Sequence, residues 1–94
     1  MTDPRLNKLR FRAWRRGFLE ADLILGGFAD SRLASLPPAE VDAFEALLDQ
    51  QDHDVYAWIL GHQEAPPEFK GEVLEALRAF HLQLPAAGGD NSRA

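Results

Sequence analysis

Apolar residues recur three and four positions apart in every clearly periodic segment of this sequence, which is the spacing of an α-helix. No segment shows the alternation of apolar and polar residues that predicts a β-strand. The helical spacing is punctuated by glycine and proline at Gly17, Pro37-Pro38, Gly61 and Pro66-Pro67. The sequence therefore predicts an all-α fold, a compact bundle of five short helices, with residues 1–84 as a single helical domain.

The expected helices run over about residues 4–13, 18–33 and 38–49, then over a short segment ended by Gly61, and finally over 66–82. Asp52 or Asp54 is expected to cap the short helix. Phe69 is expected to begin the apolar stripe of the last helix, and Leu19 to widen that of the second. Residues 85–94 read as a polar, disordered tail.

Two adjacent glycines, Gly26 and Gly27, lie inside the second expected helix. Glycine weakens a helix interior by up to about 1 kcal/mol relative to alanine, so its presence there calls for a reason. We expect the close approach of a neighbouring helix, with a bound ligand as the less favoured alternative.

The charges are unevenly distributed along the sequence. The 94 residues carry a net charge of −5, yet residues 1–16 hold six cations and one acid. The six cations are Arg5, Lys8, Arg10, Arg12, Arg15 and Arg16. The pattern predicts a basic edge on an acidic body, whose partner is either nucleic acid or an acidic protein surface. Nucleic acid is the weaker alternative, because the acidic body would repel a duplex and no recognition helix is evident.

Catalytic and metal-binding patterns are missing from the sequence. The absence of cysteine excludes a disulfide scaffold, a thiolate zinc site and a cysteine nucleophile. We expect His53 in a solvated loop, and His62 and His81 near helix C-termini, because none has a metal-ligand spacing. Asp52 and Asp54 are interpreted as a capping pair, with general acid/base chemistry as a remote alternative. We therefore expect no enzyme, no catalytic residue and no metal site.

Arg16, Gly17 and Glu20 lie together where the second helix begins, and two interpretations are open. In the local one, Glu20 pairs with Arg16 four residues before it and favours the helix dipole. That interpretation does not explain why several arginines crowd the same place, since uncompensated charges cost stability. A planar guanidinium suits bidentate recognition of a carboxylate, so we favour a surface displayed to a protein partner. Trp14 is expected to pack beside the helix end, with base stacking as the alternative.

The stretch DHDVYAWIL supplies a second candidate surface. Tyr56 and Trp58 fall on different helix faces, so at most one can lie fully in the core with Val55 and Ile59. An aromatic side chain left partly outside is a common interface anchor. For Trp58 the sequence leaves core packing and an interface role about equally open.

These two stretches carry a resemblance to a known family. RRGFLEADLILGGFAD resembles the RGxxE signature of the SdhE-type succinate dehydrogenase flavinylation and assembly factors, and DHDVYAWILGH is similar to their second signature. LPPAEVDAFEALLD occupies the third-helix position of that family, so the resemblance spans about residues 9–80. Val55, where leucine is usual, and the doubled glycine are small departures outside the signature residues.

The resemblance implies a five-helix bundle and a role outside catalysis. Such factors bind the flavoprotein subunit of succinate dehydrogenase, and in some bacteria of fumarate reductase, and promote covalent attachment of FAD to a histidine of that subunit. FAD then belongs to the client and is not stably bound by the factor. The implied partner-binding residues are Arg16, Gly17, Glu20, Asp22, Tyr56 and Trp58. Truncating Arg16 or Glu20 is expected to cripple flavinylation with the fold intact.

Two further expectations concern location and the alternative function. The N-terminus has no apolar signal region, and the longest apolar run, residues 23–29, is far shorter than the ~20 residues that span a bilayer. We expect a cytoplasmic bacterial protein that is monomeric when free, without membrane insertion and without nucleic acid. The alternative is a small helical adaptor or nucleic-acid-associated regulator that uses the basic N-terminal edge.

Overall fold

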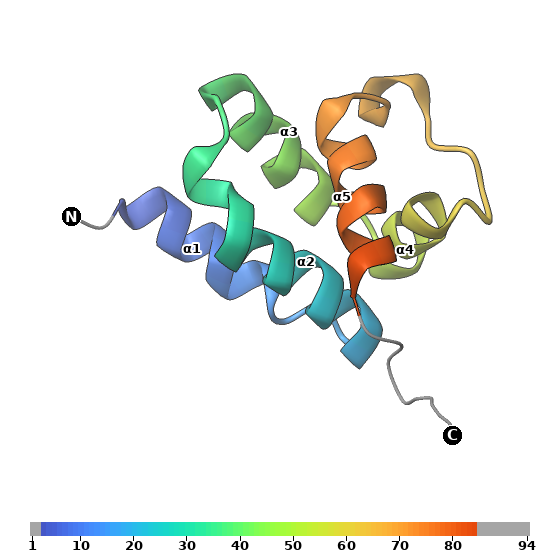
Figure 1. The fold of residues 1–94 in the computed structure, drawn as a ribbon, viewed down its shortest axis with the longest axis horizontal. Helices are drawn as coiled ribbons and strands as arrows, with labels where there is room; N and C mark the ends of the chain where they lie inside the picture. The colour runs from blue at the N-terminus through green and yellow to red at the C-terminus, as the bar shows by residue number, and fades with distance from the viewer. Residues whose placement is uncertain (1–2, 85–94) are drawn as a thin grey trace.

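The computed structural model describes residues 3–84, and these residues form helices and connecting turns without a strand. The α-helices are α1 (Pro4–Ala13), α2 (Leu19–Arg32), α3 (Pro38–Leu48), α4 (Asp52–Leu60) and α5 (Glu72–Gln83). Two short 3₁₀ helices, η1 (Leu33–Ser35) and η2 (Pro67–Phe69), follow α2 and precede α5. The prediction of an all-α bundle of five short helices is confirmed for this part of the chain (Figure 1). The predicted tail, residues 85–94, lies outside the described residues.

The helices begin and end where local chemistry favours it. The carboxylate of Asp3 accepts a hydrogen bond from the Arg5 amide at 2.8 Å and so caps α1. Pro38 occupies the first turn of α3, where its missing N–H is not needed. Gly61 ends α4 with a φ of 81°, a left-handed conformation that glycine adopts readily. The predicted end of α4 is confirmed.

The core lies where α2 meets α3 and α5. Phe28 of α2 and Phe44 of α3 are both fully buried, with ring centroids 5.7 Å apart. Leu77 of α5 is fully buried as well. Figure 1 shows α1 and α2 side by side, and α4 against α5. Burying these apolar faces supplies most of the stability of short helices, which are marginal in isolation.

The two adjacent glycines of α2 admit large side chains from other elements. A Cβ on Gly26 would overlap the indole of Trp14, and one on Gly27 would lie 3.2 Å from the ring of Phe80. The indole N–H of Trp14 donates to Asp30 at 3.2 Å. Close approach, rather than a ligand, therefore explains both glycines, and the expectation that Trp14 packs is confirmed.

The predicted start of the last helix is wrong. Pro66 and Pro67 open the short η2, and the chain becomes extended at Lys70 before α5 begins at Glu72. The physical reason is a tertiary contact, since the ring of Phe69 stacks on Trp58 of α4 with centroids 5.3 Å apart. Phe69 thus packs onto α4 from η2 and does not belong to the stripe of α5.

The start of α4 also differs from the prediction. Gln51 occupies the N-cap without a side-chain hydrogen bond, and Asp52 and Asp54 lie in the first turn. Acidic residues are favourable there because of the helix dipole, but neither caps the helix. His53 lies in the same turn of α4, exposed, and not in a loop.

Within residues 3–84, no helix combines the length and the apolar character needed to cross a lipid bilayer.

Candidate functional site

Backbone conformation and side-chain hydrogen bonds stabilise the joint between α1 and α2, which comprises residues 14–18. Trp14 ends α1, and Phe18 precedes α2 in an extended conformation. Between them Gly17 has a φ of 109°. The carboxylate of Asp22, in the first turns of α2, accepts a hydrogen bond from the Arg16 amide at 2.6 Å. Asp22 thereby holds the incoming chain against the start of α2, and its implied role in partner binding stays a prediction.

Arg16 is buried, with only 9% of the residue exposed. Its guanidinium donates to Asp52 Oδ1 through Nε at 2.9 Å and contacts the same oxygen through Nη2 at 2.8 Å. It also donates to the carbonyl oxygens of Leu48 at 2.7 Å and Arg12 at 3.1 Å. One side chain thus joins the end of α1, the end of α3 and the start of α4.

This placement bears on both interpretations of Arg16. Its side chain is turned inward and is not displayed on the surface, because Asp52 and two carbonyl groups satisfy its donors. The alternative interpretation, a local pair with Glu20, does not hold either, since the carboxylate partner of Arg16 is Asp52, 36 residues away in the sequence. A contact between Arg16 and another protein stays a prediction.

The contacts of Arg16 with Asp52 and the two carbonyl groups, which we call the Arg16 clamp, require glycine at position 17. Its φ lies in the region that side chains disfavour, and a Cβ there would lie 3.2 Å from Asp52 Oδ2. Any larger residue would strain the backbone and crowd the carboxylate that holds Arg16. Gly17 itself is exposed, so its backbone is also accessible from outside.

The residues that do point outward here are the first two of α2. Leu19 is 63% exposed, which overturns the expectation that it widens the buried stripe of α2. Glu20 is exposed, and no cation of residues 3–84 lies within 4 Å of its carboxylate. Both side chains are therefore accessible to a partner.

Aromatic side chains extend this surface from the joint to α4. The ring of Phe18 stacks on His53 at 4.7 Å and meets Tyr56 edge-on at 5.2 Å. Gly17, Phe18 and His53 also line one open hollow in the surface. Tyr56, which is half-buried, therefore adjoins the RGxxE stretch in space, although nearly 40 residues separate them in the sequence.

Trp58 lies in the core, and only 6% of it is exposed. It stacks on Phe69, and its carbonyl oxygen accepts a hydrogen bond from Arg78 at 3.1 Å. Of the two possibilities that the sequence left open for Trp58, core packing is the one observed.

The basic edge is largely neutralised within the chain. Arg5 contacts Asp42 at 2.6 Å and Glu45 at 2.7 Å, Arg10 contacts Asp30 at 3.2 Å, and Arg12 contacts Asp49 at 2.6 Å. The expectation that these charges are uncompensated is wrong, because α2 and α3 supply carboxylates at matching positions. Few cations are left to meet phosphate groups.

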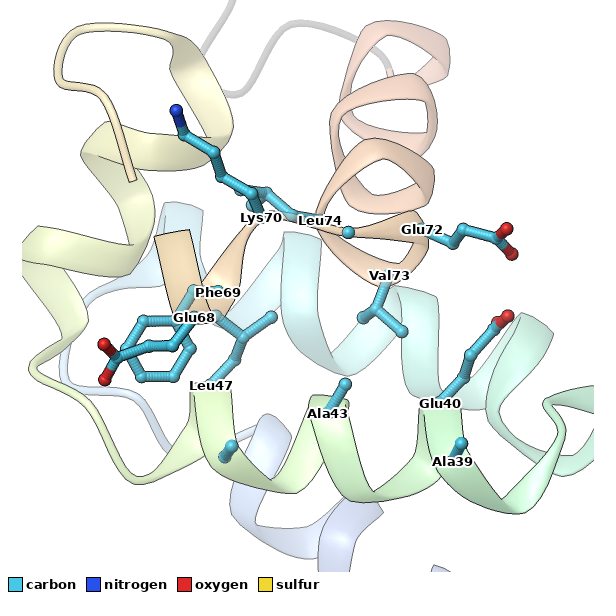
Figure 2. A pocket seen from close by; sticks show the side chains of 12 residues that line it. Ala39, Glu40, Ala43, Leu47, Glu68, Phe69, Lys70, Glu72, Val73 and Leu74 are labelled. Carbon is cyan, nitrogen blue, oxygen red and sulfur yellow. The ribbon is translucent and has the colours of Figure 1, made fainter. Parts of the chain in front are cut away.

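A groove of about 180 Å³ lies between α3 and the start of α5 (Figure 2). Ala43, Leu47 and Val73 line it, and Glu40 and Glu72 reach toward each other at one end. A hydrogen bond between these two carboxyl groups raises the pKa of Glu40 above its ordinary value. The groove is smaller than the roughly 300–1,000 Å³ of typical small-molecule sites. Within the described residues, no three side chains are grouped as metal ligands would be.

Comparison with known proteins gives a consistent result. Residues 7–81 match the model of a family described as "Flavinator of succinate dehydrogenase". The FAD assembly factor SdhE of Legionella pneumophila is 41% identical over 64 residues, which are 68% of this chain and 80% of that protein.

Two eukaryotic relatives are longer proteins. Mitochondrial succinate dehydrogenase assembly factor 2 of Dictyostelium discoideum is 39% identical over 71 residues, which are 76% of this chain and 50% of that protein. Its counterpart in Candida glabrata is 35% identical over 82 residues, which are 83% of this chain and 54% of that protein. The chain thus spans about half the length of these mitochondrial relatives. All three relatives are named as assembly factors and not as enzymes.

Proposed function

Because the chain belongs to the family of flavinators of succinate dehydrogenase, as its two signature stretches predicted, we propose that it is an assembly factor for the flavoprotein subunit of that enzyme. It binds this client, and as a second client the flavoprotein subunit of fumarate reductase. Binding promotes the covalent attachment of FAD to a histidine of the client. The chain is monomeric when free, and it acts in the compartment that holds the unflavinylated subunit, which is the cytoplasm in a bacterial host.

The observation that carries this proposal is the placement of side chains at the α1–α2 joint. The Arg16 side chain is buried and bonded within the chain, while Leu19 and Glu20 are exposed on the first turn of α2. A surface fixed in this way loses little conformational entropy when it binds, which favours affinity. Tyr56 and His53 border the same surface and extend the area that a client could cover.

The contribution to flavinylation is conformational in this proposal. Attachment requires the flavin and the client histidine to be held in near-attack geometry. In this proposal FAD belongs to the client and is not stably bound by this chain, and the small volume of the groove between α3 and α5, about 180 Å³, supports this. The factor would bind one arrangement of the client better than others and raise the population of that arrangement.

A gel experiment tests the function directly. The client subunit is expressed with and without this chain, and covalently retained flavin is read as fluorescence of the denatured subunit. We expect the signal to rise when the chain is present. Equal fluorescence in both samples would refute the proposal.

Glu20→Ala tests the site. We expect this variant to lose most of the flavin signal while it stays folded, because Glu20 has no ion-pair partner among residues 3–84 and contributes only the ~0.3–1 kcal/mol of an acidic residue in a first helical turn. Glu68→Ala is the matched control, since it removes an exposed carboxylate from η2. A full signal from Glu20→Ala, or an equal loss from both variants, would show that Glu20 is not a contact residue.

The alternative function, a regulator that binds nucleic acid through the basic edge, is not favoured by any specific observation. The pairing of Arg5, Arg10 and Arg12 with carboxylates weighs against it, because these cations are no longer available to phosphates.

A further inference from the structure

The cations of α1 and the joint fall into two groups. Four of them contact carboxylates of the body: Arg5, Arg10, Arg12 and Arg16. The other two, Lys8 and Arg15, have no carboxylate of residues 3–84 within 4 Å, and both are exposed. Within α1 and the joint, the cations left without a carboxylate partner are therefore these two side chains alone.

These two cations flank an exposed aromatic ring. Lys8 and Phe11 are three positions apart on α1 and so share its outer face, and Arg15, just past the end of α1, reaches the Phe11 ring from the joint. Phe11 is 59% exposed, and the Arg15 guanidinium lies 3.7 Å from the centroid of its ring. Beside the ring is a shallow, almost wholly apolar hollow lined by Asn7, Lys8 and Arg12.

This combination is typical of a binding surface. Within residues 3–84, the fold leaves this large aromatic ring mostly exposed beside two cations that have no carboxylate partner. Aromatic and arginine side chains are the residues that most often dominate the energetics of protein interfaces. The stacking of Arg15 on Phe11 also orders both side chains before any partner arrives, which lowers the entropic cost of binding.

We propose that Lys8, Phe11 and Arg15 form a second docking surface, which takes a carboxylate-bearing, acidic surface of the flavoprotein client. The proposal rests on the function proposed above and extends the contact beyond the RGxxE stretch. Phe11 is the apolar anchor, and Lys8 and Arg15 meet client carboxylates on either side of it. Arg15 lies two residues before Gly17, so the new surface continues directly into the joint.

Charge distribution favours a protein over a nucleic acid as the occupant. Asp42, Glu45 and Asp49 accompany the paired arginines of α1, so carboxylates as well as cations lie near this helix. A polyphosphate backbone would approach those carboxylates, whereas a protein can place a few carboxylates opposite the two free cations and none elsewhere.

The test compares two double variants of the full chain binding to the flavoprotein subunit. Lys8→Ala/Arg15→Ala removes the two unpaired charges, and Arg5→Gln/Arg10→Gln removes two paired, exposed ones with the same change in net charge. Association rates are measured between about 20 and 300 mM salt, where screening changes the range of charge interactions. We expect the first variant to associate about tenfold more slowly at low salt and to lose most of its salt dependence. The second should stay within about twofold of the parent.

A second pair of variants tests the anchor. Phe11→Ala should weaken binding at least about fivefold, chiefly through faster dissociation. Leu82→Ala removes another exposed apolar side chain, which is 82% exposed on α5, and should leave binding unchanged. Melting temperatures of all four variants show whether each one is folded under the binding conditions.

The outcomes separate this inference from the proposed function. If the parent chain neither binds nor flavinylates the client, the proposed function fails and this surface fails with it. If the parent binds but the Lys8/Arg15 and Arg5/Arg10 variants behave alike, only the second docking surface is refuted. It is refuted equally if the Lys8/Arg15 variant loses affinity for random-sequence RNA and keeps its affinity for the client.

Discussion

Replacing Arg16 by alanine should destabilise the fold, because this side chain binds three segments together. The substitution leaves the Leu48 carbonyl oxygen without its 2.7 Å donor in a buried position. An unsatisfied buried acceptor costs about 1–3 kcal/mol. The substitution also removes the pair with Asp52, whose carboxylate is 25% exposed. Since water can partly replace the lost partner, that loss adds about 1–2 kcal/mol and not the ~3–5 of a fully buried pair.

The expected total is about 2–5 kcal/mol, a large share of the ~5–15 kcal/mol that stabilises a typical domain. Urea denaturation followed by circular dichroism would measure it. The matched control is Arg12→Ala, which removes an arginine–aspartate pair of similar length, 2.6 Å, but with 37% and 59% of its side chains exposed. Exposed pairs contribute about 0–1 kcal/mol. If Arg16→Ala and Arg12→Ala cost the same within about 0.5 kcal/mol, the clamp reasoning is wrong.

A double-mutant cycle isolates the pair itself. Arg16→Ala, Asp52→Asn and their combination should show a coupling energy of about 0.5–3 kcal/mol. The cycle also bears on function, because the sequence alone predicted that Arg16→Ala would abolish flavinylation in an intact fold. Burial changes that expectation: the loss of activity should follow the unfolded fraction and lessen at temperatures where the variant is folded. Persistent inactivity of fully folded Arg16→Ala would instead make Arg16 a contact residue.

Three further predictions concern other positions. Gly17→Ala should cost about 1–3 kcal/mol, measured by thermal unfolding, because its φ is 109° and the new Cβ would lie 3.2 Å from a carboxylate oxygen; an unchanged melting temperature would refute it. Gly26→Ala should cost about 1–3 kcal/mol and alter tryptophan fluorescence, because the Cβ overlaps the Trp14 indole; unaltered emission and stability would contradict the observed packing. Glu40→Gln should raise the melting temperature at pH 7 and lose that advantage below the ordinary pKa of 4.5. The raised pKa of Glu40 means that its stabilising protonated form is present at low pH and lost as pH rises, so a constant advantage between pH 4 and 7 would exclude the Glu40–Glu72 interaction as the cause.

The local features of this fold were predictable from the sequence, because they depend on neighbouring residues. Helical spacing located the five helices, and the glycines at 17 and 61 marked a joint and a helix end. The start of α5 was not predictable, because Phe69 leaves the helical pattern only to stack on Trp58. A tertiary contact of this kind overrides the period, and the one local signal was Gly71, which is the N-cap of α5.

The candidate site was predictable in place but not in detail. Arg16 and Glu20 have the spacing of a helical ion pair, and nothing nearby in the sequence reveals that Arg16 turns to Asp52. Asp52 was assigned to capping because an aspartate before a helix usually caps it. The stack of Phe18 on His53 was also missed, because it joins residues 35 positions apart and no local pattern indicates it. The only signal in the sequence for a contact between the two stretches was the aspartate that starts the second signature, Asp52.

The two signature stretches therefore form one structural unit, in which some residues hold the joint together and others are exposed to a partner. Arg16 and Asp52, one from each stretch, bind to each other in the interior, and Gly17 fits only because it has no side chain to crowd them. Substituting any of these three would impair function through the shape of the joint. Leu19 and Glu20 are exposed and take no part in this interior contact, so their substitution would act mainly on the partner. A loss of function at the joint consequently identifies a contact residue only when the stability of the same variant is unchanged.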